Sequence, residues 1–206
     1  MRAVYPGVYR DKRGEETIMI ENDSKDLSIV IRGIRFEGSN LSFLHVVDPL
    51  PLDEKQLALF SLTGDYLINY ELEFEMPIPI EFGNETWPSI LYVRFRSDQP
   101  PGGNIDEKMD VRLVWAKHEI PFMSIDSGFD GLYLLQKAMP PGHLIKCCLN
   151  CAFSEYSPLS NSFACFRDNK QGILAVRSKG DLVRVWDSMT EYVQETYLCP
   201  EFQPKI

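Results

Sequence analysis

Three stretches of the chain alternate between apolar and polar residues, and this period of two restricts the fold more than any other feature. In INYELEFEM, every second residue from Tyr70 to Met76 is apolar, and the residues between them are Glu71, Glu73 and Glu75. SILYVRFRSD and DVRLVWAKHE follow the same pattern. Successive side chains of a strand point to opposite faces, so each run predicts a strand with one buried face and one solvated face. Such strands are typical of an antiparallel sheet or sandwich.

Other parts of the first 120 residues also read as strands. GVYRDKRGEETIMIEN predicts a hairpin that turns at residues 11–14, and the β-prone run DLSIVIRGIRFEG is interrupted by Gly33, which we expect to mark a bulge. Pro77 and Pro79 cannot donate ladder hydrogen bonds, so they predict a strand end or a sheet edge. The polar segment SDQPPGGNIDEKM is expected to join two antiparallel strands.

The pattern changes near Pro121. DSGFDGLYLLQKAMPPG carries Phe129, Leu132, Leu135 and Met139 at helical spacing before Pro-Pro-Gly, which predicts a helix. QGILAVRS then predicts a strand, and KGDLVRVWDSM predicts a short helix opened by its aspartate.

These patterns together predict an α+β protein. We expect a β-rich body with an antiparallel sheet or sandwich over residues 1–120. A small mixed α+β element that carries the cysteines follows over residues 121–206. No clear linker separates the two parts, so the sequence allows one domain or two.

The chain is acidic, with 30 Asp and Glu residues against 21 Lys and Arg residues and a net charge of -9. This charge argues against general nucleic-acid binding and against anionic membranes. It suits a basic protein partner, or it serves only solubility. Glu71, Glu73 and Glu75 form an acidic strip on one strand face, which either recognises such a partner or pairs across strands with Arg94 and Arg96.

The sequence also bears on the compartment. Its N-terminal residues do not resemble a secretory signal, and no stretch approaches the roughly 20 apolar residues that span a bilayer. The five cysteines are odd in number, and Cys147 and Cys148 are adjacent. A reducing cytoplasm therefore fits best.

Four of the five cysteines lie in CCLNCAFSEYSPLSNSFACFRDNK, residues 147–170. Cys148 and Cys151 form a Cys-x2-Cys pair, and Cys165 and Cys199 could complete a four-thiolate set for tetrahedral zinc. His143 could substitute as a ligand. The alternatives are inert buried thiols, because cysteine packs as a small hydrophobe, or a redox pair.

Polar and aromatic residues accompany the cysteines in sequence. Tyr156, Arg167, Glu195 and Tyr197 could surround a pocket near the cluster. Alternatively, Arg167 pairs with Glu195 to orient the cluster while the tyrosines cover it.

The C-terminal motifs also carry a resemblance. C-x2-C-x2-S-x-YSP, then CFR, then QETYLC-x-EF resembles the C-terminal half of an uncharacterised family of bacterial cytoplasmic proteins, over about residues 129–203. The resemblance implies a bacterial origin and no defined activity. Some families of this kind are immunity proteins that neutralise a toxin, which is an analogy and not a property of these residues.

The chain contains no Gly-x-Ser-x-Gly, no phosphate-binding loop and no dinucleotide fingerprint, and its three histidines are isolated. We therefore expect a non-enzymatic, cytoplasmic protein-binding module with a structural zinc site. An immunity-type protein that neutralises a basic partner is its concrete form. The alternative is an enzyme, metal-dependent or thiol-based, with its site at the cysteine cluster.

Overall fold

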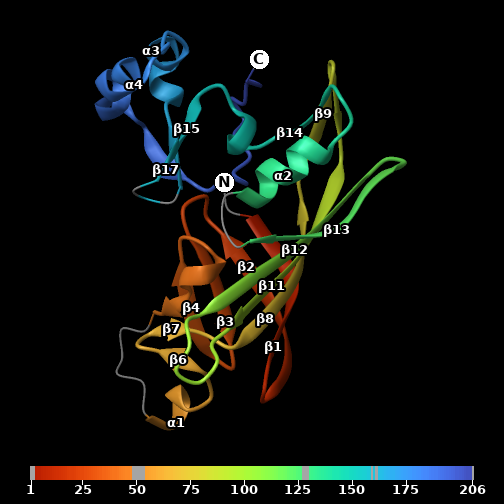
Figure 1. Cartoon of the computed structure of the whole chain (residues 1–206), viewed down its shortest axis with the longest axis vertical. Helices are drawn as coiled ribbons and strands as arrows, with labels where there is room; N and C mark the ends of the chain where they lie inside the picture. Colours follow the sequence, from red (N-terminus) through yellow and green to blue (C-terminus); the bar gives the residue numbers. More distant parts are fainter. Residues whose placement is uncertain (1–2, 48–53, 127–129, 159, 161, 206) are drawn as a thin grey trace.

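The computed structural model describes residues 3–47, 54–126, 130–158, 160 and 162–205 (Figure 1). Within these residues, eleven strands form one sheet in the order β13-β12-β11-β8-β1-β2-β3-β4-β5-β7-β6, and all neighbouring pairs are antiparallel. The strands are β1 (Ala3–Asp11), β2 (Gly14–Asn22), β3 (Leu27–Ile31), β4 (Ile34–Gly38), β5 (His45–Val46), β6 (Leu62–Thr63), β7 (Tyr66–Leu67), β8 (Tyr70–Pro77), β11 (Ser89–Asp98), β12 (Asp106–Trp115) and β13 (His118–Asp126). The predicted α+β fold with an N-terminal antiparallel sheet is confirmed.

Strand β8 is an interior strand of this sheet, between β1 and β11, and its alternation is confirmed. Tyr70 and Leu72 are buried, as are Phe74 and Met76 further along the strand. Strands β11 and β12 are joined by the loop of residues 99–105 and pair in the predicted antiparallel manner. Strand β11 buries every second side chain along its whole length, and β12 does so from Val111 to Trp115. Each large apolar side chain removed from water stabilises the fold by about 1.5–3 kcal/mol, so this face is the main core.

The interruption at Gly33 is a turn, not the predicted bulge. Arg32 and Gly33 have φ angles of 50° and 81°, and they connect β3 to β4 as a two-residue hairpin loop. Two consecutive residues with positive φ match the right-handed twist of the flanking strands. The register shift that the structure does show lies in β12, between Val111 and Leu113.

The two prolines mark strand ends, as predicted. Strand β8 stops at Pro77, and β9 (Ile80–Phe82) begins just after Pro79. Strand β9 pairs with β10 (Glu85–Trp87) on one side and with β14 (His143–Ile145) on the other, in a separate three-stranded sheet.

The predicted helix before Pro140 is α2 (Asp130–Ala138), which packs against β12 and β13. Leu132, Leu135 and Met139 are buried as expected, and Phe129 lies outside the described residues. In Figure 1, α2 lies between the large sheet and the C-terminal segment, drawn in blue. That segment contains a third sheet of β15 (Ser154–Ser157), β16 (Ser162–Cys165) and β17 (Glu191–Val193).

The strand predicted for residues 171–178 is wrong. The chain instead forms α3 (Lys170–Leu174), because the Asn169 side chain accepts the Gly172 N–H at 3.1 Å and caps the helix. The predicted second helix is present as α4 (Lys179–Val185), but its cap is Ser178, which accepts the Asp181 N–H at 3.2 Å. The remaining short elements are α1 (Glu54–Leu57), η1 (Leu41–Phe43), η2 (Cys148–Asn150), η3 (Arg167–Asn169) and η4 (Trp186–Ser188).

The C-terminal part is joined to the large sheet through Gln194, just after β17. The Asn22 amide donates to Gln194 Oε1 at 2.7 Å, and the Gln194 backbone N–H donates to the Ser24 carbonyl at 2.9 Å. Gln194 Nε2 donates to the carbonyls of Lys25 and Ser39, both at 3.3 Å. These bonds fix the C-terminal segment to two loops of the sheet.

The predicted division at residue 120 falls inside β13, and both parts contribute to one core. Ile145, Cys147, Phe163 and Val193 belong to the same buried cluster as the side chains of the large sheet. In the described part of the chain, no helix is long and apolar enough to cross a membrane.

A second polar link joins the turns of the first two hairpins. The Arg32 guanidinium binds both carboxylate oxygens of Asp11, at 2.7 and 2.8 Å, and also donates to the Leu59 carbonyl at 2.9 Å. Burial favours the neutral form of Asp11, but the hydrogen bonds from Arg32 and from the Arg13 N–H lower its pKa to about 2.

We predict that Asp11→Asn flattens the acid dependence of stability. The folded-state pKa lies below the ordinary value of 3.8, so the contribution is present above about pH 4 and is lost as the pH falls towards 2. The wild type should lose about 2 kcal/mol more than the variant over this range. Urea unfolding between pH 2 and 6 measures the difference, and the exposed Asp65→Asn is the control. Parallel curves for wild type and Asp11→Asn would contradict the assignment.

Gln194→Leu should lower the free energy of unfolding by about 1–3 kcal/mol. The variant keeps the side-chain volume but leaves the buried Asn22 amide without its acceptor and removes the donor to two carbonyls. Urea denaturation at pH 7 measures the loss. Gln203→Leu is the matched control, because Gln203 is exposed and its substitution should change stability by less than about 0.5 kcal/mol. Equal effects of the two substitutions would show that the Gln194 bonds contribute nothing.

Candidate functional site

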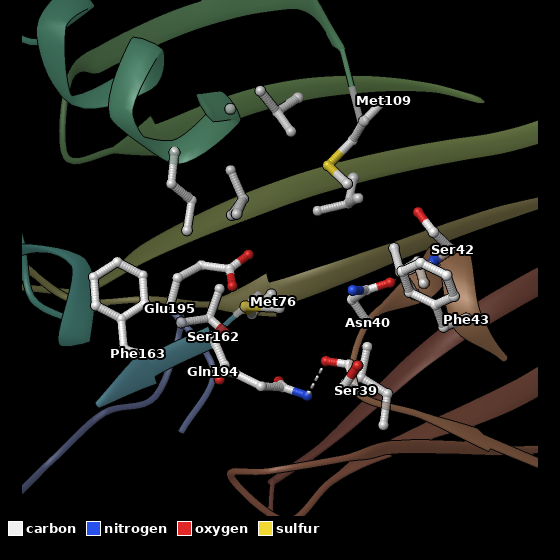
Figure 2. Close-up of a pocket in the computed structure, with 18 of the residues that line it drawn as sticks. Ser39, Asn40, Ser42, Phe43, Met76, Met109, Ser162, Phe163, Gln194 and Glu195 are labelled. Atoms are coloured by element: carbon white, nitrogen blue, oxygen red, sulfur yellow. Dashed lines mark hydrogen bonds between the residues drawn. The ribbon is translucent and has the colours of Figure 1, made fainter. Parts of the chain in front are cut away.

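A cavity of about 240 Å³ lies between the buried face of the large sheet, α2 and the C-terminal segment (Figure 2). Its floor is apolar and comes from alternate residues of three adjacent strands. These residues are Phe74, Met76, Leu91, Val93, Met109 and Val111. The loop of residues 39–43, the start of α2 and residues 194–196 form the other walls.

Glu195 brings a carboxyl group into this apolar space. Figure 2 shows its side chain extending from the C-terminal segment towards Met76. Burial raises the pKa of Glu195, and a hydrogen bond from its own backbone N–H offsets only part of this effect. Among the described residues, no Lys, Arg or His lines the cavity, and no ion pair to Glu195 is present. Tyr156 and Phe163, whose ring centroids are 5.8 Å apart, also line the cavity.

The five cysteines are all buried and free. The four predicted zinc ligands come from three separate segments: Cys148 and Cys151 from the turn around η2, Cys165 from the end of β16, and Cys199 from the C-terminal segment. Burial raises the pKa of Cys148, and the neighbouring thiols of the other three predicted ligands and of Cys147 raise it further. The fold therefore gathers the predicted set in one region.

Main-chain hydrogen bonds bring these segments together. The Cys148 N–H donates to the Tyr197 carbonyl at 3.0 Å, and the Ala152 N–H donates to the Gln203 carbonyl at 2.6 Å. The Lys205 N–H donates to the Asn150 carbonyl at 2.8 Å. The last residues of the described chain thus run beside the Cys-x2-Cys turn.

Two of the four thiols also accept main-chain N–H groups two residues downstream. The Glu201 N–H donates to Cys199 Sγ at 3.4 Å, and the Arg167 N–H donates to the Cys165 thiol. Burial raises the pKa of Cys165, and the N–H and guanidinium groups of Arg167 offset only part of this effect. Within the described residues, however, no three or more His, Cys, Asp or Glu side chains already enclose a position for an ion. Zinc therefore stays a prediction.

The predicted pairing of Arg167 with Glu195 is not what the structure shows. Arg167 forms an ion pair with Glu191, which also binds Lys25 at 3.1 Å. The reason is strand pairing, because Glu191 lies directly opposite Cys165 in the β16–β17 ladder. Glu195 lies beyond the end of β17 and lines the cavity instead.

His143 does not lie with the cysteines as the proposed substitute ligand. Its ring stacks on Phe82 with a centroid distance of 4.4 Å, and Trp87 and Trp115 pack at its edges. Tyr156 and Glu195 therefore belong to the cavity, Arg167 belongs to the cysteine region, and His143 belongs to a separate aromatic cluster.

The predicted acidic strip is partly neutralised by neighbouring arginines. Arg10 binds Glu71 at 3.0 Å and Glu73 at 2.7 Å, and Arg94 binds Glu73 at 2.5 Å. The second expected arginine, Arg96, binds Asp110 at 3.5 Å instead. Glu75 is exposed and forms no ion pair within the described residues.

A groove runs across the open face of the sheet beside Glu75. Glu73, Glu75 and Arg94 supply its charges, and Phe122 is half exposed at its edge. Its apolar part is made by Pro6, Val8, Tyr92 and Phe122. The Arg94 guanidinium lies 5.8 Å from the centre of the Phe122 ring.

The sequence did not reveal the cavity, because its walls come from segments separated by more than 150 residues. The sequence indicates Tyr156, Arg167, Glu195 and Tyr197 only as residues that could surround a pocket near the cysteines, and of these Tyr156 and Glu195 line the cavity. One local feature does indicate Glu195: it is the single charged residue of YVQETYL, residues 192–198, whose other side chains are apolar, aromatic, amide or hydroxyl groups.

Comparisons with known proteins place the chain in a family without assigning an activity. No curated protein and no solved structure matches it. The model of a family of unknown function, DUF6304, matches residues 3–154. The match includes every strand of the large sheet and two of the predicted zinc ligands, Cys148 and Cys151. The resemblance described from the sequence covers about residues 129–203, so the two overlap only over residues 129–154. The chain belongs to this family of unknown function, DUF6304.

Proposed function

We propose that the protein is a non-enzymatic binding module that docks a basic protein on the open face of its large sheet. The groove beside Glu75 carries this proposal, because it combines exposed aromatic surface with a carboxylate that has no ion pair within the described residues. Aromatic anchors and a polar rim are typical of protein interfaces.

The charge of the chain supports a basic partner. A net charge of -9 attracts a cationic protein over long range and raises its association rate. Glu73 forms ion pairs with both Arg10 and Arg94. In the acidic strip, Glu75 is therefore the carboxylate that we expect to contact the partner. An immunity-type role, in which the partner is a basic toxin, is the concrete form of this proposal.

The same proposal gives the cysteines a structural zinc ion. Cys148, Cys151, Cys165 and Cys199 would supply four thiolates, which suits a closed tetrahedral site without a position for substrate. The ion would fasten residues 197–205 to the Cys-x2-Cys turn. Neither the cavity nor the groove is lined by a cysteine, which favours a structural role over the alternative of an enzyme centred on the cluster.

Substitutions in the groove should abolish capture of the partner. We expect Phe122→Ser, which removes the aromatic anchor, and Glu75→Lys, which reverses the unpaired charge, each to weaken binding at least about 10-fold. Affinity purification from the native host with each variant, followed by titration of the recovered protein at two salt concentrations, measures the effect.

Asp65→Lys is the matched control for charge. Asp65 is exposed on the turn between β6 and β7, and its substitution changes the net charge by the same amount as Glu75→Lys. The proposal requires one basic protein that the wild type and Asp65→Lys retain and the groove variants lose. Equal retention by all four proteins would place binding elsewhere, and no recovered protein would contradict a binding function.

Metal analysis tests the zinc proposal. Freshly purified, untagged protein should contain about one zinc per chain, as measured by inductively coupled plasma mass spectrometry. Cys148→Ser and Cys199→Ser should each lose the ion, because a hydroxyl group does not replace a thiolate ligand.

Cys147→Ser is the control, because it removes a buried thiol next to the predicted ligands. The Leu149 and Asn150 N–H groups beside it donate to the carbonyls of Glu195 and Cys147, so replacing the thiol with a hydroxyl group leaves both hydrogen bonds in place. This variant should keep its zinc. Metal-free wild type with five titratable thiols would exclude the site, and loss of zinc from Cys147→Ser alone would assign the ligands differently.

A further inference from the structure

The carboxyl group of Glu195 has no evident structural purpose in the cavity. A carboxylate that leaves water without a cation or several donors to replace its hydration is destabilising. Glu195 forms no ion pair within the described residues, and the floor of the cavity beneath it is apolar. Carboxyl groups in such surroundings are concentrated at binding and catalytic sites.

We propose that this cavity binds a small organic amine with an apolar body, whose ammonium group pairs with Glu195. The inference is independent of the partner proposed for the open face, because the cavity lies on the opposite, buried face of the sheet. The sheet itself separates the two sites, and strands β8 and β11 contribute residues to both.

The charges of the lining select a cation. Glu107 and Glu195 both line the cavity, and the described lining residues include no Lys, Arg or His. An anionic ligand would meet repulsion without compensation. An ammonium group supplies three donors and a full positive charge, which is what a desolvated carboxylate lacks.

The volume limits the size of the ligand. The cavity of about 240 Å³ exceeds the roughly 150 Å³ of a protein cavity that holds benzene. It is smaller than the roughly 300–1,000 Å³ of pockets for drug-sized molecules. Its floor of Phe74, Met76, Leu91, Val93, Met109 and Val111 suits one ring or a short branched chain.

The lining places the polar contacts at defined positions. In the view of Figure 2, Ser162 is drawn on the same side of the cavity as Glu195, and Asn40 and Ser42 are drawn with Phe43 on another side. Phe43 is half exposed, so the cavity reaches the surface beside it. An amine held by Glu195 would therefore place its apolar body over Met76 and Met109.

Three probes of nearly equal shape test the proposal on the wild type: 2-phenylethylamine, 2-phenylethanol and phenylacetate. Calorimetric titration at pH 7 should rank the amine first and phenylacetate last. The amine should bind about 10- to 100-fold more tightly than the alcohol, the range expected for a charge-assisted hydrogen bond. Equal affinity of the amine and the alcohol would overturn the assignment.

Glu195→Gln tests the residue itself. The variant should lose the preference for the amine and bind the alcohol as the wild type does, whereas the exposed control Asp65→Asn, outside both the cavity and the groove, should keep the preference. Unchanged amine affinity in Glu195→Gln would overturn the proposal. A third outcome would also overturn the proposal. If an oligolysine peptide bound in a Glu195-dependent manner and the amine did not bind, the cavity would be a site for a lysine side chain of another protein. The ranking of the three probes on the wild type does not depend on the folding of any variant.

Discussion

The hydrogen bonds of Gln194 are the constraint on which the C-terminal half of the structure depends. This one buried side chain accepts from Asn22 and donates to the carbonyls of Lys25 and Ser39. It thereby replaces the water that the loops after β2 and β4 would otherwise bind. The side chain of the next residue, Glu195, points in a different direction and lines the cavity. The hydrogen bonds that fix Gln194 against the loops therefore also position the carboxyl group of Glu195.

The cysteine turn holds the other side of the same segment. The Leu149 N–H donates to the Glu195 carbonyl at 3.2 Å, and the Cys148 N–H donates to the Tyr197 carbonyl at 3.0 Å. The wall of the cavity therefore lies between the loops of the large sheet and the region where the thiols gather. A bound zinc ion would not touch the cavity, yet it would stiffen the backbone from which Glu195 extends. The buried thiols and the carboxyl group of Glu195 are in this sense parts of one arrangement.

The sequence predicts those features that depend on neighbours along the chain. The period of two in β8, β11 and β12 is a local pattern, so it identifies both the strands and their buried faces. Prediction from local patterns fails where a side chain interacts with a residue that is distant in sequence. Arg167 pairs with Glu191 because the ladder of β16 and β17 places it there, and α3 forms because the cap at Asn169 outweighs the β-prone residues that follow. The cavity is the extreme case, since its lining runs from Leu27 to Thr196 and no local pattern records it.

Strand β8 connects the two proposed binding surfaces. Phe74 and Met76 face the cavity, whereas Glu73 and Glu75 face the groove on the open side. A shift of one residue in the pairing of β8 with β1 and β11 would exchange these two sets, placing glutamates in the core and apolar side chains in water. The cost of that exchange fixes the register. The alternation that restricts the fold most strongly therefore also separates two surfaces. One is the acidic face that we propose for a partner, and the other is the apolar interior, in which Glu195 supplies the carboxyl group that we propose binds an amine.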